Sequence, residues 1–155
     1  MSAFAQGAIA GGIALLLTIQ FIRPARINPP VVQEHTLEAA VTIPPAIGSI
    51  LERSCNDCHS DRTRWPWYSS VAPISWLVVN DVMQGRRHLN FSQWLPPKAE
   101  NPAQYTRQRF YAICKAVQSH EMPIPAYVFV HPQAGLSQAD IQTICSWTQG
   151  ESPPS

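Results

Sequence analysis

The sequence predicts an all-α fold in which one apolar helix precedes a compact helical domain. Three observations support this prediction. The first 22 residues contain no ionisable side chain, later segments repeat apolar residues at helical spacing, and 15 prolines divide the chain into short segments. No two segments alternate apolar and polar residues around a hairpin turn, so we expect no sheet.

We divide the 155 residues into an N-terminal membrane anchor (1–26), a linker (27–42), a helical domain (43–150) and a tail (151–155). The formal net charge of +1 excludes the strongly basic surface of a nucleic-acid-binding protein. Charged residues make up 14% of the chain, below the roughly 25% of an average soluble domain. Part of this deficit lies in the apolar N-terminal segment.

The N-terminal segment from Ala3 to Ile22 has 20 residues, and as a helix it would measure about 30 Å, the thickness of a hydrocarbon core. We therefore expect a transmembrane helix. A cleaved signal peptide is the competing interpretation, but no small-x-small cleavage site precedes Arg23-Pro24. A buried core helix is less favoured because the segment is apolar on all sides.

Proline marks the starts of the first two helices of the domain. We expect the first to begin at Pro44-Pro45 and to run into Cys55. The second is expected to begin near Pro73 and to stop at Gly85, since apolar residues recur between them at helical spacing.

Capping residues mark the last two helices. Asn101 caps the third, and Pro102 follows at its first position. Ser137 caps the fourth, which Asp140 completes as a capping box and Gly150 ends.

The motif that carries chemistry is Cys55-Asn56-Asp57-Cys58-His59, a C-x-x-C-H sequence typical of covalent haem attachment. Two thiols at this spacing lie on one side of a helical turn, where they can form thioethers with the two haem vinyl groups. The adjacent His59 is then the proximal iron ligand. A redox dithiol is less favoured because no βαβ unit surrounds it. A zinc site is less favoured because it needs a second close ligand pair, and Cys114 and Cys145 are far apart in sequence.

The sixth iron ligand is predicted to be Met122, which lies between the third and fourth helices in a loop that two prolines stiffen. Met83 belongs to the second helix, where we expect it in the core. The alternatives are an open coordination position or a second histidine ligand, namely His131, His120, His88 or His35.

Several further motifs extend the pattern over most of the chain. They are Ser54–Ser60, Trp65–Ser69, Ala72–Trp76, Leu89–Ser92, and Glu121–Pro125 followed by His131-Pro132. With these motifs, the stretch 43–149 resembles the haem-binding-domain family of small bacterial c-type cytochromes, and its plan is similar to that of class I cytochromes c. The resemblance implies one covalent haem c and an N-terminal anchor. In the class I proteins a proline carbonyl orients the proximal imidazole, and Pro73 is expected in that role.

Aromatic and basic residues follow the haem motif. The large rings Trp65, Trp67, Tyr68, Trp76 and Phe91 are too many for a small surface, and we expect some of them, with Trp65 and Trp67 as candidates, to pack on the haem. Arg62 and Arg64 are candidates for binding the haem propionates, since guanidinium pairs well with carboxylate. Ordinary core packing and solvated surface charge are the alternatives.

Cys114 and Cys145 each lie on the apolar side of a predicted helix. In an oxidising compartment they can form a disulfide between the third and fourth helices. Two buried free thiols are the equally favoured alternative.

The sequence therefore predicts an electron carrier rather than an enzyme, because a haem with both axial positions filled does no bond chemistry. We expect it in the bacterial cytoplasmic membrane with a periplasmic haem domain, where it serves redox partner proteins and takes no small-molecule substrate, alone or as a subunit of a larger complex. The alternative is a haem enzyme or gas sensor with an open sixth position.

Overall fold

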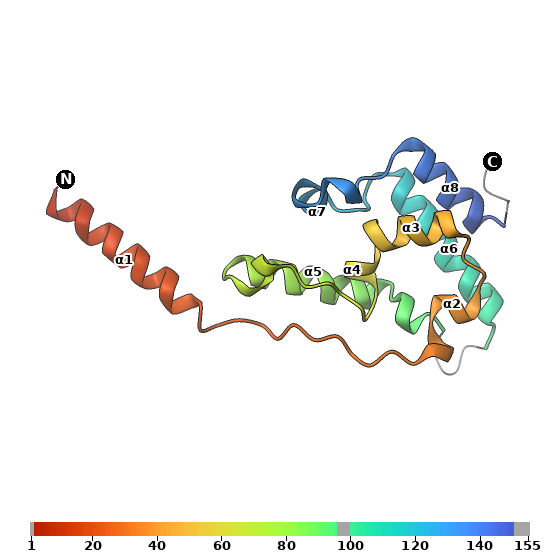
Figure 1. The fold of residues 1–155 in the computed structure, drawn as a ribbon, viewed down its shortest axis with the longest axis horizontal. Helices are drawn as coiled ribbons and strands as arrows, with labels where there is room; N and C mark the ends of the chain where they lie inside the picture. Colours follow the sequence, from red (N-terminus) through yellow and green to blue (C-terminus); the bar gives the residue numbers. More distant parts are fainter. Residues whose placement is uncertain (1, 96–99, 151–155) are drawn as a thin grey trace.

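The computed structural model describes residues 2–95 and 100–150, and within these residues all regular structure is helical, as predicted (Figure 1). The predicted tail, 151–155, lies outside the described residues. The α-helices are α1 (Ala3–Ile19), α2 (Leu37–Ala40), α3 (Pro45–Ser54), α4 (Asn56–His59), α5 (Ile74–His88), α6 (Pro102–Gln118), α7 (Pro125–Val130) and α8 (Gln138–Thr148). The 3₁₀ helices are η1 (Gln33–His35), η2 (Trp67–Ser70), η3 (Phe91–Gln93) and η4 (Pro132–Ala134).

Helix α1 is shorter than the predicted membrane span. It has 17 residues and ends at Ile19, so it measures about 25 Å. Within the described part of the chain, no helix has the length and apolar character needed to cross a membrane. The predictions of a transmembrane helix and of a single-pass location in the cytoplasmic membrane are therefore wrong.

The end of α1 has a physical cause in the tertiary structure. The side-chain amide of Gln20 donates to the carbonyl oxygen of Ala72 at 2.9 Å and accepts from the amide of Ala72 at 3.0 Å. Arg23 donates to the carbonyl of Ser70 at 2.8 Å. These bonds hold residues 20–23 against the segment before α5. The helix therefore ends at Ile19, although the apolar sequence pattern predicted that it would continue to Ile22.

The segment 27–42, predicted as a linker, contributes to the folded domain. It contains η1 and α2, and the side chain of Leu37 is 1% exposed within the main core. Figure 1 shows the chain running from α1 along α5 before it reaches α2.

All four predicted helix starts are confirmed, and two of them have side-chain caps. Helix α3 begins at Pro45, Asn101 accepts from the amide of Gln104 at the start of α6, and Ser137 and Asp140 form the capping box of α8. Helix α5 begins at Ile74, next to the predicted Pro73, but it continues through Gly85 to His88.

The core lies where α3, α6 and α8 pack together. Its aromatic members form a continuous chain, in which the ring centroids of Trp94 and Phe110 are 5.5 Å apart and those of Phe110 and Trp147 are 4.6 Å apart. Cys114 of α6 and Cys145 of α8 form a disulfide with a Cα–Cα distance of 4.9 Å. The open choice between a disulfide and free thiols is thereby decided.

Gly85 allows α5 to pack directly against α4. A Cβ atom at this position would lie 2.6 Å from the carbonyl oxygen of Cys58, closer than any real contact. Glycine therefore serves here as the point of closest approach between two helices, and not as the helix end that its sequence position indicated.

Arg86 and Asp61 form a buried ion pair beside this contact, with side chains 8% and 1% exposed. Asp61 also accepts from Asn90 at 3.0 Å, and Arg86 donates to the carbonyls of Ser60 at 2.8 Å and Ile27 at 2.7 Å. Because every charge has several partners, this pair ties the loop after α4 and the extended segment to α5.

We predict that Gly85→Ala lowers the free energy of unfolding by about 1–3 kcal/mol through overpacking against α4, although alanine is the better helix former by about 1 kcal/mol. The matched control is Gly48→Ala in α3, where the added Cβ meets only the side chain of Ile43 at 3.9 Å. This control should raise the stability by up to about 1 kcal/mol. Urea unfolding of both variants measures the difference, and equal effects would contradict the close packing.

We also predict that the Cys114→Ala/Cys145→Ala double variant loses about 2–4 kcal/mol of stability, because the disulfide closes a loop of 31 residues. Urea unfolding with and without a thiol reductant is the measurement. The reductant should destabilise the wild-type protein and leave the double variant unchanged. A wild-type protein that is insensitive to reductant under unfolding conditions would show that the bond is absent.

Candidate functional site

The C-x-x-C-H motif forms a separate helical turn at the end of α3. The backbone leaves the α3 conformation at Cys55, where φ is −129°, and resumes as α4. The amides of Cys58 and His59 both donate to the carbonyl of Cys55, at 3.2 and 2.9 Å. Both thiols are free. This turn places two cysteines and a histidine on one short element, as the motif predicted.

The imidazole of His59 is held by the backbone of α5. Its Nδ1 lies 3.1 Å from the carbonyl oxygen of Gly85 and 3.0 Å from that of Leu89, so it donates to this pair. Among the described residues Nε2 takes part in no hydrogen bond. A histidine that donates through one nitrogen presents the other as a ligand atom, which is the arrangement of metal-binding histidines.

The role predicted for Pro73 therefore belongs to other residues. The carbonyls of Gly85 and Leu89 orient the imidazole, while the carbonyl of Pro73 accepts from the amide of Trp76 at 3.0 Å at the far end of α5. The difference arises because α5 continues past Gly85, and its last turn is the part of the helix that reaches His59.

Burial sets the protonation of all three motif residues. It lowers the pKa of His59, an effect that the hydrogen bonds with Leu89 and Gly85 oppose, so the ring is neutral near pH 7 and able to ligate a metal. Burial, with the neighbouring Cys58, raises the pKa of Cys55 to about 12. Burial, with Asp57 and Asp81, raises the pKa of Cys58 to about 11. Both sulfurs are therefore neutral thiols, without the lowered pKa of a reactive redox dithiol.

Met122 lies on a loop that folds back onto α6. His120 has a left-handed φ of 57°, which ends the helix, and the amides of Glu121 and Met122 then both donate to the carbonyl of Ala116, at 3.0 and 3.2 Å. These bonds fix the backbone that carries the thioether. The Met122 side chain is 38% exposed.

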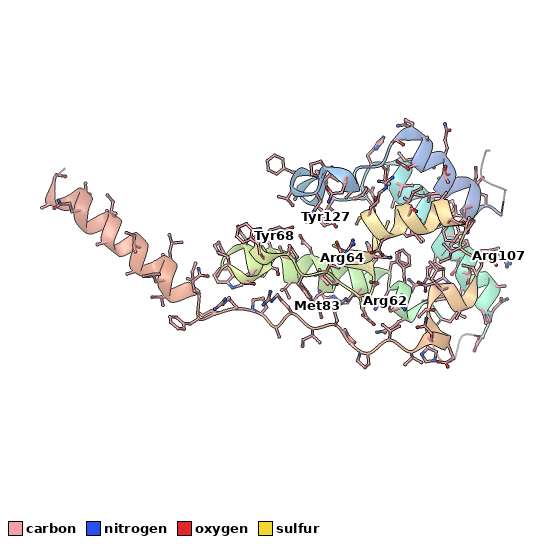
Figure 2. The ribbon with its side chains drawn as sticks, viewed as in Figure 1. Arg62, Arg64, Tyr68, Met83, Arg107 and Tyr127 are labelled. Carbon is pink, nitrogen blue, oxygen red and sulfur yellow. A yellow bond between two sulfur atoms is a disulfide. The ribbon has the colours of Figure 1, made fainter. Side chains whose placement is uncertain are left out.

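Met122 and His59 line the same cavity, which has a volume of about 220 Å³. Its other walls are mainly apolar and come from α6 and from Phe91, whose ring centroid is 6.2 Å from that of His59. Cys55 lies at the edge of this cavity. Of the predicted ligands, His88 also lines it, whereas His120 and His35 do not. Met83, which we predicted in the core, is 47% exposed on α5 (Figure 2).

Cys58 lines a second cavity of about 530 Å³ between α5 and α7. Apolar residues of both helices form its walls, and Trp67 lies at its rim, 79% exposed. Polar groups gather on one side, where the hydroxyl of Tyr68 lies 2.5 Å from Nε2 of His131 and Tyr127 donates to Asp57 at 2.8 Å. Figure 2 shows Tyr127 on α7 facing the segment that carries Tyr68.

The two arginines predicted to bind propionates are already paired within the chain. Arg62 contacts Glu38 at 3.5 Å and lines neither cavity. Arg64 lines the second cavity but contacts Glu52 at 3.1 Å and Asp57 at 3.3 Å.

Of the two tryptophans predicted to pack on the haem, only Trp67 lines a cavity. Trp65 lines neither, and its buried indole Nε1 has no hydrogen-bond partner among the described residues.

Among its described residues, the structure does not provide the second pair of ligands that a zinc site at Cys55 and Cys58 would need. Cys114 and Cys145 are bonded to each other and are not available for a zinc site with Cys55 and Cys58. In the part of the chain that the structure describes, no group of three or more His, Cys, Asp and Glu residues is arranged so that it could hold a metal ion by itself. Apolar cavities beside two thiols and a free imidazole nitrogen fit a porphyrin bound through its edge and its iron.

Sequence reasoning missed the carbonyl of Leu89, the close approach at Gly85 and the presence of Arg109 in the first cavity. The positions of Gly85 and Leu89, 26 and 30 residues after His59, were visible in the sequence. No local signal linked them to the imidazole.

Comparison with known proteins identifies the family. The family model of the haem-binding domain matches residues 14–150, which is most of the chain. No curated protein and no solved structure matches the sequence significantly. The matched region contains both cavities, the motif turn and the Met122 loop. The chain belongs to the haem-binding-domain family, and haem is its cofactor.

Proposed function

We propose that the protein is a mono-haem c-type cytochrome that passes single electrons between partner proteins. Cys55 and Cys58 hold the porphyrin as thioethers, one from each of the two cavities that their turn lines. Their neutral thiols suit addition to a vinyl group, in which the sulfur bonds to carbon and the thiol hydrogen completes the new C–H bond. The bound haem supplies a reversible change of one electron at its iron.

His59 is the proximal ligand in this proposal, and Met122 is the sixth. The observation that carries it is that both side chains line one apolar cavity, while His59 is oriented from behind by the carbonyls of Gly85 and Leu89. Hydrogen bonds from Nδ1 to carbonyl oxygens make the other nitrogen a stronger donor to a metal. The loop bonds to Ala116 hold the Met122 backbone where a flexible thioether alone would not stay.

With His59 and Met122 as its ligands, a bound haem would leave no position for substrate or oxygen, and its chemistry would be limited to electron transfer. The second cavity opens beside exposed apolar side chains, with Trp67 79% and Leu77 67% exposed. A small apolar rim of this kind fits the brief, low-area contacts of redox partners. We expect no small-molecule substrate.

We predict that the purified wild-type protein weighs one haem more than its polypeptide and gives the optical spectrum of haem c. Cys55→Ala should leave a single thioether and the spectrum of a haem with one free vinyl group. The Cys55→Ala/Cys58→Ala variant should have the bare polypeptide mass after denaturation. Intact-mass spectrometry and the alkaline pyridine spectrum measure both. Noncovalent haem in the wild-type protein would contradict the proposal.

We predict that Met122→Ala abolishes the weak long-wavelength band of sulfur bound to ferric iron. The reduction potential should fall, since axial ligands set haem potentials over a range of about 0.8 V. Met83→Ala is the matched control, because Met83 is exposed on α5 and lines neither cavity. It should leave band and potential unchanged.

The ferrous wild-type protein should bind carbon monoxide slowly or not at all, and the Met122→Ala variant should bind it readily. Rapid binding by the wild-type protein would favour a haem enzyme or gas sensor with an open position.

A further inference from the structure

Arg109 of α6 is a cation in the wall of the apolar cavity that also contains His59 and Met122. One terminal nitrogen, Nη1, donates to the carbonyl of His88 at 3.2 Å, and Nη2 donates to the hydroxyl of Tyr105. The guanidinium carbon lies 4.5 Å from the centroid of the Tyr105 ring. These contacts hold the guanidinium plane in one orientation.

The Nε–H group of Arg109 is buried and has no hydrogen-bond partner among the described residues. A buried donor without an acceptor is unfavourable, and more so when it belongs to a charged group. The Nε–H group therefore lacks an acceptor in the protein alone, and a ligand with an acceptor atom at this position would satisfy it.

The charge of Arg109 is also unpaired. In the described part of the chain no carboxylate contacts its guanidinium, whereas four other arginines each contact at least one. These are Arg53 with Asp140, Arg62 with Glu38, Arg64 with Glu52 and Asp57, and Arg86 with Asp61. Arg62 and Arg64 already have ion pairs and do not line the first cavity, whereas Arg109 lines it and still needs an anion.

We propose that Arg109 binds a propionate carboxylate of the haem and thereby selects a porphyrin with free carboxylates. A carboxylate presents two acceptor oxygens in a plane, which matches the guanidinium fork. It supplies both the acceptor that Nε lacks and the negative charge that the cavity walls lack. This inference rests on the proposed function, and it replaces Arg62 and Arg64 as the propionate partners.

The test compares two porphyrins in the full chain carrying Cys55→Ala and Cys58→Ala, so that binding is reversible. Ferric protoporphyrin and its dimethyl ester are titrated into this protein and into the same protein with Arg109→Gln, Arg109→Lys or Arg107→Gln. Arg107 is the matched control, because it is exposed on the same helix and does not line the cavity (Figure 2). The ratio of the two dissociation constants within each protein cancels differences in folding between the variants. Comparing these ratios between proteins cancels the difference in solubility between the two porphyrins.

We expect the free acid to bind about 10-fold or more tighter than the ester in the parent protein, as a charge-assisted hydrogen bond implies. Arg109→Gln should reduce this ratio to less than about 3-fold, Arg109→Lys should keep part of it, and Arg107→Gln should keep all of it.

If the parent protein binds the free acid and the ester with equal affinity, this result alone overturns the inference. Equal ratios in Arg109→Gln and Arg107→Gln overturn it as well. If Arg109→Gln does not fold, the ratios of dissociation constants in the parent protein and in the Arg109→Lys variant test the inference. Failure of the proposed function is distinguishable, since the wild-type chain would then lack covalent haem, whatever ratio the parent protein gives.

Discussion

The contact between α4 and the last turns of α5 is the constraint on which the site depends. The carbonyl of Leu89, just past the helix end, lacks a helical partner, and that of Gly85 already accepts from the Leu89 amide at 2.9 Å. Both receive the imidazole N–H of His59. The C-terminal end of a helix carries partial negative charge, which favours a donor there and strengthens the opposite nitrogen as a ligand. This geometry exists only because residue 85 has no side chain.

Burial and charge are distributed so that the cavities stay apolar. The buried pair of Arg86 and Asp61 is satisfied by several hydrogen bonds and lies behind α4, where it fixes the loop and the extended segment. Arg64 is neutralised by two carboxylates at the edge of the second cavity. The thiols of the motif are kept protonated by the same burial that lowers the pKa of His59. A low-dielectric surrounding therefore sets the state of all three motif residues.

The core beside the site has a different origin. It is formed by α3, α6 and α8, with the disulfide between α6 and α8 and an aromatic chain that reaches the site through Phe91. Because α6 contributes both to this core and to the first cavity, the position of Met122 after α6 is set by core packing. The packing of α6 in the core thus brings the Met122 loop close to the C-x-x-C-H motif, although the two are far apart in the sequence.

The sequence by itself determined the elements whose signals are local. The capping residues Asn101 and Ser137 and the prolines before α3 set helix starts, and the C-x-x-C-H spacing brought two thiols and an imidazole onto one turn, because these effects act within about one helical turn. Only the tertiary structure decided which residues from distant parts of the chain pack around the motif. Gly85 and Leu89 replaced Pro73 as partners of His59, Gln20 ended the helix that the apolar run continued, and Arg109 entered the cavity, since each depends on packing between segments far apart in the chain.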